Sequence, residues 1–256
     1  MAPCYGRVRF QGRDWSAVIE GERLGLLDGD WWSKRATVVA QAAVKDVTWL
    51  PPILPRTILC VGRNYRDHAA ELGNDVPAEP LFFLKQWGAL TAHEAVVTAP
   101  KWAGRIDYEG ELVLVIGKTV RNVTSSREAV DAVMGLTVGN DITARQLQSR
   151  DGQWTRSKGF DGFAPVGPWV VLDQHPEGRQ VTTTVNGLVR QDASTDAMIF
   201  PCDRLIMEAS RFMTLYPGDL IFTGTPAGVG PVESGDVVEV TVQGVGKLSN
   251  LIKNGD

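Results

Sequence analysis

Two glutamates separated by a single glycine stand directly before a run of branched apolar residues. Glu109 and Glu111 flank Gly110, and residues 112–116 read Leu-Val-Leu-Val-Ile. Such a run predicts a buried strand, and side chains two residues apart on a strand point to the same face. Two partly buried carboxylates repel each other, so either one keeps a proton or a cation lies between them. A divalent metal site is one interpretation of this pair, and a solvated strand end is the other.

Asp141 offers a third carboxylate, at the end of a short apolar strand expected at 136–138. An aspartate in this position also suits a turn or a helix cap. Together with Glu109 and Glu111 it would form an all-oxygen ligand set, which favours Mg²⁺, Mn²⁺ or Ca²⁺ over Zn²⁺. Asp107 shares the strand parity of the glutamates and is a candidate outer partner of the site.

His68 and Glu71 are three residues apart in a segment, 63–72, that is predicted to be helical. Side chains at this spacing are neighbours on a helix. A carboxylate orients an imidazole and raises its basicity, so the pair is a candidate base for activating water. A surface ion pair is the alternative interpretation.

Lys158 lies in a segment rich in glycine and aromatic residues, 156–163. There it could neutralise a substrate carboxylate or a developing enolate, or it could be a surface lysine with a buried stem. The Gly-rich turn at 223–230 could hold an anion through backbone N–H groups, but it lacks the Gly-Lys-Ser/Thr of a phosphate loop.

The elements that position these residues are mostly strands. Strands are expected at 5–10, 15–20, 23–27, 58–62, 81–85, 168–172, 181–185, 219–223 and 236–242, and helices at 63–72, 126–134 (capped by Ser126) and 203–215. Because the helices do not alternate regularly with the strands, the sequence predicts an α+β fold that is mainly β. A proline cluster at 51–55 predicts a linker between a small N-terminal β unit, residues 1–50, and a catalytic domain, residues 56–256.

The composition narrows the class of protein. The chain has 256 residues, of which 43% are hydrophobic and 22% charged, as is ordinary for globular proteins. A net charge of −4 without a long basic run argues against nucleic acid or an anionic membrane as partner. The odd count of three cysteines, without paired metal spacing, argues against a disulfide framework. Together with the lack of a signal peptide or a membrane-length apolar run, it predicts a cytoplasmic protein.

Five blocks of the chain, in order, resemble the fumarylacetoacetate hydrolase family. They are Val61-Gly62-Arg63-Asn64-Tyr65 with His68 and Glu71, Tyr108-Glu109-Gly110-Glu111-Leu112, Asn140-Asp141 with Thr143-Ala144-Arg145 and Gln148, Ser157-Lys158 with Phe160-Asp161, and the segment 218–230. The resemblance covers about residues 56 to 250. It implies a mixed β-roll with a small N-terminal β unit, a homodimer, a small oxoacid substrate, and Mg²⁺ or Mn²⁺ as cofactor.

The resemblance also assigns roles to individual residues. It implies Glu109, Glu111 and Asp141 as metal ligands, His68 and Glu71 as the water-activating dyad on a segment that can order as a lid, Lys158 as a further catalytic residue, and Arg63, Tyr65, Arg145, Gln148 and Thr225 as substrate contacts. The sequence departs from the family at Gln86-Trp87-Gly88 and at Gln146. Because of the first departure, the exact substrate of the relatives is a weaker guide to the substrate of this chain.

The reaction expected on this basis is hydrolysis of a carbon–carbon bond in an acylpyruvate-type 1,3-diketo acid, with a divalent metal stabilising the pyruvate enolate. Decarboxylation of oxaloacetate and isomerisation of 2-hydroxyhepta-2,4-diene-1,7-dioate pass through the same kind of enolate and remain alternatives. A non-catalytic oxoacid-binding protein is a more remote alternative.

Overall fold

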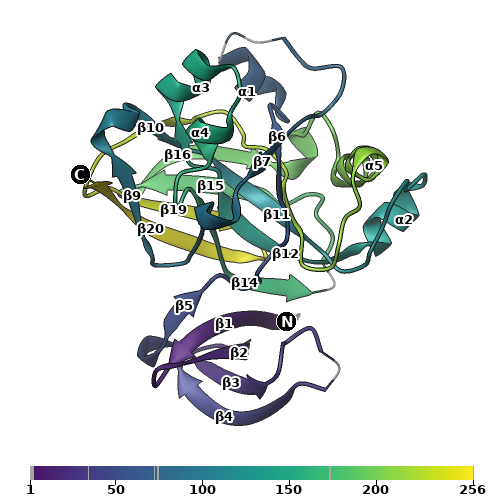
Figure 1. The fold of residues 1–256 in the computed structure, drawn as a ribbon, viewed down its shortest axis with the longest axis vertical. Helices are drawn as coiled ribbons and strands as arrows, with labels where there is room; N and C mark the ends of the chain where they lie inside the picture. The colour runs from purple at the N-terminus through teal and green to yellow at the C-terminus, as the bar shows by residue number, and fades with distance from the viewer. Residues whose placement is uncertain (1–2, 34, 72, 74, 173, 256) are drawn as a thin grey trace.

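The computed structural model describes residues 3–33, 35–71, 73, 75–172 and 174–255, and among these residues strands far outnumber helices (Figure 1). The prediction of a mainly β, α+β fold is confirmed. The largest sheet has twelve strands. Its hydrogen-bonded order is β4 (Thr37–Ala43), β3 (Arg23–Asp28), β2 (Arg13–Glu20), β1 (Cys4–Phe10), β14 (Ala164–Leu172), β12 (Val133–Asn140), β11 (Gly110–Ile116), β17 (Leu220–Phe222), β6 (Ile58–Gly62) and β7 (Leu81–Lys85), with β5 (Thr48–Leu50) beside β1 and β8 (Leu90–Ala92) beside β14.

Two smaller sheets complete the β structure. One contains β13 (Thr143–Ala144), β10 (Ile106–Tyr108) and β18 (Gly230–Val232), and the other contains β16 (Leu188–Ser194), β15 (Gln180–Val185), β19 (Val237–Val242), β20 (Gly246–Gly255) and β9 (Val96–Pro100). The second of these sheets packs against β11 and β12 of the large sheet.

Strand β11 lies at the centre of the core and is buried on both faces. Leu112, Leu114 and Ile116 belong to the apolar cluster that includes the valines of β15 and β19. Val113 and Val115 face the opposite way and pack in a second cluster with residues of β6 and β17. Because successive side chains on a strand alternate in direction, a strand that is apolar at every position needs cover on both sides. The apolar run thus fixes the strand that carries Glu111.

The helices are short and lie outside the sheets. They are α1 (Arg66–Glu71), α2 (Ser126–Asp131), α3 (Arg145–Asp151), α4 (Thr155–Lys158) and α5 (Cys202–Phe212), with 3₁₀ turns at Val44–Asp46, Trp87–Ala89, Lys101–Ala103 and Thr195–Ala197. Helices α2 and α5 pack together, while α3 and α4 lie beside each other near α1 in Figure 1. Within the described part of the chain, none of the helices has the length and apolar character needed to cross a bilayer.

The helix expected at 126–134 is shorter than predicted and has a different cap. It ends at Asp131, and Val133 already begins β12. Ser125, not Ser126, is the N-cap, because its hydroxyl accepts a hydrogen bond from the N–H of Glu128 at 3.2 Å. A cap side chain reaches the N–H three residues ahead, and only Ser125 has that spacing.

The N-terminal strands have a core of their own, which includes Val8, Leu24 and Trp49. They nevertheless continue the large sheet, since β1 pairs antiparallel with β14 (Figure 1). The division of the chain into residues 1–50 and 56–256 stays a prediction.

Candidate metal centre

The pairing of β11 with β12 brings the three candidate ligands together. The two strands are antiparallel, with Gly110 opposite Asn140. Asp141 therefore follows β12 directly opposite Glu109, and its N–H donates to the Glu109 carbonyl at 2.8 Å. The side-chain oxygen of Asn140 accepts a hydrogen bond from the Glu109 N–H at 2.9 Å. Both the N–H and the carbonyl of Glu109 are thus hydrogen-bonded, independently of any contact of its carboxylate.

Gly110 is required by the close approach of the neighbouring sheet. A Cβ atom at this position would lie 2.1 Å from Oγ1 of Thr183 and 2.9 Å from Cγ1 of Val240. A side chain here would push the two glutamates away from their present positions. The glycine between the two carboxylates is therefore a packing requirement of the fold.

Glu109, Glu111 and Asp141 form a cluster of buried carboxylates. One ligand oxygen from each lies within 4.8 Å of the others, and the three residues are 4%, 1% and 1% exposed. This spacing suits a single divalent cation with metal–oxygen bonds of about 2.0–2.6 Å. An all-oxygen donor set favours a hard cation over Zn²⁺.

Two of the three carboxylates are paired with cationic side chains. Glu109 accepts hydrogen bonds from Lys158 Nζ at 2.7 Å and from the Arg145 guanidinium at 2.6 Å. Burial alone would raise the pKa of Glu109, but attraction to Lys158 and Arg145 outweighs burial and holds this pKa below its ordinary value. Burial likewise lowers the pKa of Lys158, yet Asp141 and Glu109 raise it above its ordinary value overall. Glu109 and Lys158 are therefore both charged.

Asp141 has one oxygen that accepts no hydrogen bond. Its Oδ2 accepts from Lys158 Nζ at 2.6 Å. Its Oδ1 lies 2.7 Å from Lys85 Nζ, an ion pair by distance. The three N–H groups of that ammonium, however, donate to the carbonyls of Ile142, Lys158 and Phe163 at 3.0, 2.7 and 2.6 Å. Oδ1 is therefore a buried acceptor without a hydrogen-bond donor among the described residues.

Glu111 is the member of the cluster that has no cationic partner. No lysine, arginine or histidine of the described ranges pairs with it within 4.0 Å, and its Oε2 accepts a hydrogen bond from the Gly224 N–H at 2.7 Å. Burial, together with repulsion from Asp141 and Glu109, raises the pKa of Glu111 well above its ordinary value. Among the described residues, Glu111 therefore lacks a cationic partner, and Oδ1 of Asp141 lacks a hydrogen-bond donor. Both observations fit a divalent cation held by Glu109, Glu111 and Asp141.

His68 and Glu71 lie on α1 and face the same site. His68 is 4% exposed, and its Nδ1 lies 3.3 Å from Oε2 of Glu71. The Glu71 carboxylate also accepts the Gly228 N–H at 3.1 and 3.2 Å, which ties it to the Gly-rich turn. Donation from Nδ1 to Glu71, the tautomer that this contact favours, leaves Nε2 as the basic nitrogen.

A cavity of about 310 Å³ collects most of the residues predicted from the sequence. Its lining includes His68, Glu109, Glu111, Lys158, Arg63, Arg145, Gln148 and Thr225 from the prediction, together with Val61, Gly62, Ser149 and Trp154. Asp141 and Glu71 lie behind this surface and contact Lys158 and His68 respectively. Tyr65 lines a neighbouring cavity instead, and its buried hydroxyl has no hydrogen-bond partner among the described residues.

Arg145 contacts Gln148 and two carboxylates. The Arg145 guanidinium donates to Asp107 at 2.9 Å, to Gln148 at 2.7 Å and to Glu109. Asp107 therefore has the outer position expected from its strand parity, one side chain removed from Glu109. Arg145 links the two carboxylates and holds Gln148 at the cavity wall.

Lys85, Gln191 and Trp154 are site residues that sequence reasoning missed. Lys85 is 3% exposed at the end of β7, and a lysine closing an apolar strand was the available signal. Gln191 accepts the Gly110 N–H at 3.0 Å and donates to Thr225 Oγ1 at 2.7 Å, so it joins the glutamate pair to the Gly-rich turn. Nothing local in the sequence distinguishes Gln191, because its partners are more than thirty residues away.

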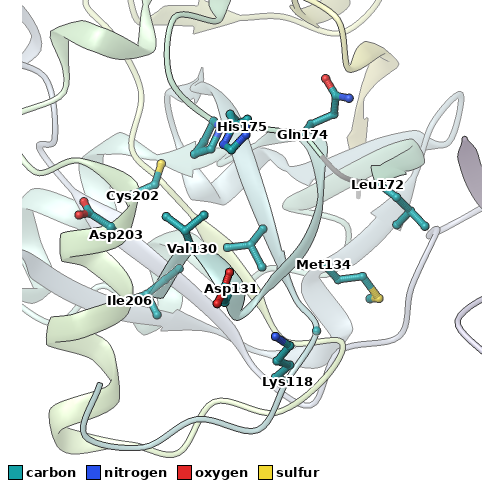
Figure 2. A pocket seen from close by; sticks show the side chains of 13 residues that line it. Lys118, Val130, Asp131, Met134, Leu172, Gln174, His175, Cys202, Asp203 and Ile206 are labelled. Atoms are coloured by element: carbon teal, nitrogen blue, oxygen red, sulfur yellow. The ribbon is translucent and has the colours of Figure 1, made fainter. Parts of the chain in front are cut away.

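A larger cavity of about 560 Å³ lies elsewhere, beside α2 and α5 (Figure 2). Its wall carries Lys118, Asp131, His175 and Asp203 around apolar residues such as Ile206. Its lining shares no residue with the carboxylate cavity. This cavity is larger than the one described above, but His68 and the candidate ligands Glu109 and Glu111 line the smaller one.

The sequence and the fold of this chain are similar to those of several known proteins. The sequence profile described as fumarylacetoacetate (FAA) hydrolase C-terminal matches residues 57–253. The crystal structure of 2-hydroxyhepta-2,4-diene-1,7-dioate isomerase from Mycobacterium marinum superposes with a TM-score of 0.91 at 39% identity, over 99% of both chains. Fumarylpyruvate hydrolase from Pseudomonas aeruginosa, in complex with Mn²⁺ and pyruvate, gives a TM-score of 0.75 at 38% identity, over 80% of this chain and 91% of that one. The oxaloacetate tautomerase YisK of Bacillus subtilis is 43% identical over 210 residues, which are 77% of this chain and 69% of that protein.

Proposed function

The chain belongs to the fumarylacetoacetate hydrolase family, and from this premise we propose that it hydrolyses a carbon–carbon bond in an acylpyruvate-type 1,3-diketo acid with Mg²⁺ or Mn²⁺ as cofactor. The observation that carries the proposal is that one cavity combines a buried carboxylate cluster with the His68–Glu71 pair. The Mn²⁺ and pyruvate in the P. aeruginosa relative support the same class of cation and product.

A divalent cation held by Glu109, Glu111 and Asp141 would act as a Lewis acid toward the oxoacid end of the substrate. Lys158 Nζ lies within hydrogen-bond distance of both Glu109 and Asp141, so it is held where it can stabilise negative charge. Its raised pKa keeps it protonated, which suits a role in stabilising an anion rather than accepting a proton.

His68 is the proposed general base. Its Nε2 would take a proton from a water molecule, and Glu71 would stabilise the resulting imidazolium at Nδ1. The hydroxide adds to the acyl carbonyl, and the bond between that carbon and the pyruvate methylene breaks. The electron pair goes to the pyruvate fragment as an enolate, which takes up at carbon the proton that His68 gained, and leaves as pyruvate. The acyl fragment leaves as a carboxylate.

A second candidate function is keto–enol or double-bond isomerisation of a dicarboxylic oxoacid. The isomerase from M. marinum and the oxaloacetate tautomerase from B. subtilis favour it, because both are extensively similar to this chain. In this case His68 would move a proton between substrate atoms, and no water would be consumed. Oxaloacetate decarboxylation would use the same oxoacid site and remains the third possibility within the family.

A substrate panel tests the proposal. Acetylpyruvate, fumarylpyruvate, oxaloacetate and 2-hydroxyhepta-2,4-diene-1,7-dioate would be assayed with Mn²⁺, with Mg²⁺ and with EDTA. Hydrolysis is expected for the acylpyruvates only with metal, and His68→Gln is expected to lower kcat by about 10²–10⁴-fold. His175→Gln, which alters a histidine of the larger cavity, is the matched control. Acylpyruvate hydrolysis that survives in His68→Gln contradicts the assignment, and turnover of the dienedioate alone would establish the isomerase instead.

A further inference from the structure

Gly110, the residue between the two glutamates, is held by side chains at a point where strand pairing has ended. Strand β17 pairs with residues 113–115 of β11, so this pairing stops before it reaches Gly110. The Gly110 N–H instead donates to Oε1 of Gln191 at 3.0 Å, and the Gly110 carbonyl accepts the hydroxyl of Thr225 at 2.9 Å. Two side chains from distant parts of the chain thus replace the missing strand at this position.

Gln191 and Thr225 also bind each other, which closes a ring of three hydrogen bonds around Gly110. Gln191 Nε2 donates to Thr225 Oγ1 at 2.7 Å and to the carbonyl of Pro226 at 2.8 Å. Because a peptide N–H can only donate and a carbonyl can only accept, the Gly110 N–H and the Pro226 carbonyl fix the orientation of the Gln191 amide. Gln191 and Thr225 are 1% and 3% exposed, so the ring lies away from bulk water.

Gln191 acts on the carboxylate cluster through Gly110. It belongs to β16 of the five-stranded sheet and is not among the residues that line the carboxylate cavity. Glu109 and Glu111 extend from either side of Gly110, so a rotation of this one residue would turn both carboxylates. Side chains that hold metal ligands in place without touching the metal commonly change metal affinity by about 10–100-fold.

Resting on the proposed function, which needs a divalent cation at the carboxylate cluster, we propose that Gln191 is a positioning residue that sets the preference of the site for a small cation over Ca²⁺. Mg²⁺ requires oxygen ligands at about 2.0–2.1 Å in a nearly regular octahedron, whereas Ca²⁺ accepts about 2.3–2.6 Å in variable geometry. A backbone locked at Gly110 has little freedom left to lose when it binds a cation that demands one geometry. Without the ring, the two glutamates can adapt to Ca²⁺ but must be ordered again to hold Mg²⁺.

The test measures cation preference by calorimetric titration of the metal-free, full-length protein with Mg²⁺ and with Ca²⁺. Gln191→Met fills similar space without hydrogen bonds. It is expected to raise the Kd for Mg²⁺ by about 10-fold or more and the Kd for Ca²⁺ by about threefold or less, so that the ratio of the Ca²⁺ Kd to the Mg²⁺ Kd falls. Thr225→Val opens the ring at its other side chain and should lower the same ratio, whereas Thr225→Ser keeps the hydroxyl and should keep the wild-type ratio. Because the ring acts as a unit, combining Gln191→Met with Thr225→Val should lower the ratio no further than the stronger single variant.

Asn250→Leu is the matched control, because Asn250 is another buried amide, 1% exposed, that donates to the carbonyls of Ala92 and Ala95 at 2.9 Å. It should lower the melting temperature and leave the ratio unchanged, which separates lost stability from lost positioning. If Gln191→Met does not fold, the two Thr225 variants decide. An unchanged ratio in Gln191→Met and Thr225→Val, an equal weakening of both cations, or the same shift in Asn250→Leu overturns the inference about Gln191 alone. If the wild type binds neither cation, the cluster is not a metal centre and the proposed function fails with it.

Discussion

Substituting glutamine at Glu109 and at Glu111 is expected to change the stability of the metal-free protein in different ways, although both residues belong to one cluster. Glu109 has two cationic partners, Lys158 at 2.7 Å and Arg145 at 2.6 Å. Removing one member of a buried ion pair costs about 3–5 kcal/mol. Because Lys158 keeps Asp141 and Arg145 keeps Asp107, Glu109→Gln should cost about 3 kcal/mol, near the lower limit of that range. For a chain of this size the melting temperature should fall by about 6–12 °C.

Glu111→Gln should leave the metal-free protein as stable as the wild type or stabilise it by up to about 1 kcal/mol. The glutamine removes a buried acid without a cationic partner, and its amide oxygen can still accept the Gly224 N–H. Urea denaturation at neutral pH with EDTA measures both variants against the wild type. At 100 times its Kd, Mn²⁺ should stabilise the wild type by about 2.7 kcal/mol, and both variants should lose most of this gain. An equal loss of stability for both variants in EDTA would refute the charge distribution derived for the site.

Three further predictions follow from the same geometry. Burial and like charges raise the pKa of Glu111, so its contribution to the stability of the metal-free protein should decline as pH rises above the ordinary value of 4.5 toward the raised pKa. Over the same range, stabilisation by Mn²⁺ should grow. Thermal melting of the wild type and of Glu111→Gln from about pH 5 to about pH 8, with EDTA or with Mn²⁺, checks the sign of both trends. Gly110→Ala should weaken Mn²⁺ binding and cost about 1–3 kcal/mol, because its Cβ atom meets Thr183 Oγ1 at 2.1 Å, and adding Thr183→Ala should recover part of both losses in the same titration. Lys85→Met should cost about 3–5 kcal/mol in urea denaturation, since Asp141 loses an ion pair and three buried carbonyls lose their donor; a loss below about 1 kcal/mol would contradict this account.

The sequence was sufficient to predict those parts of the site that depend on local spacing. The common face of Glu109 and Glu111 follows from the alternation of side chains along an extended segment. The proximity of His68 and Glu71 follows from helical spacing, and the structure has them at 3.3 Å on α1. The buried run after the glutamates was recognisable because it is apolar at every position, and β11 is buried throughout its length.

Long-range contacts could not be derived from spacing. That Asp141 lies opposite Glu109 depends on the register between β11 and β12, and the sequence alone offered Asp141 equally as a turn or a cap. Lys85 reaches Asp141 because β7 joins the sheet at the far side of β6, a pairing that no local pattern specifies. The role of Tyr65 as a substrate contact stays a prediction, since this residue lines the cavity next to the one that His68 lines. In each case, a tertiary pairing decides which of several locally reasonable roles the side chain has.

The residues at the two ends of the cavity differ in how tightly they are packed. The carboxylates stand at the ends of β11 and β12, which are covered on both faces by apolar residues, so altering their position disturbs the core. Arg63 and Trp154 lie in partly exposed segments that follow β6 and precede α4, where substitution disturbs fewer packed groups. A cavity built in this way can keep its carboxylates in place while the residues around its other end change.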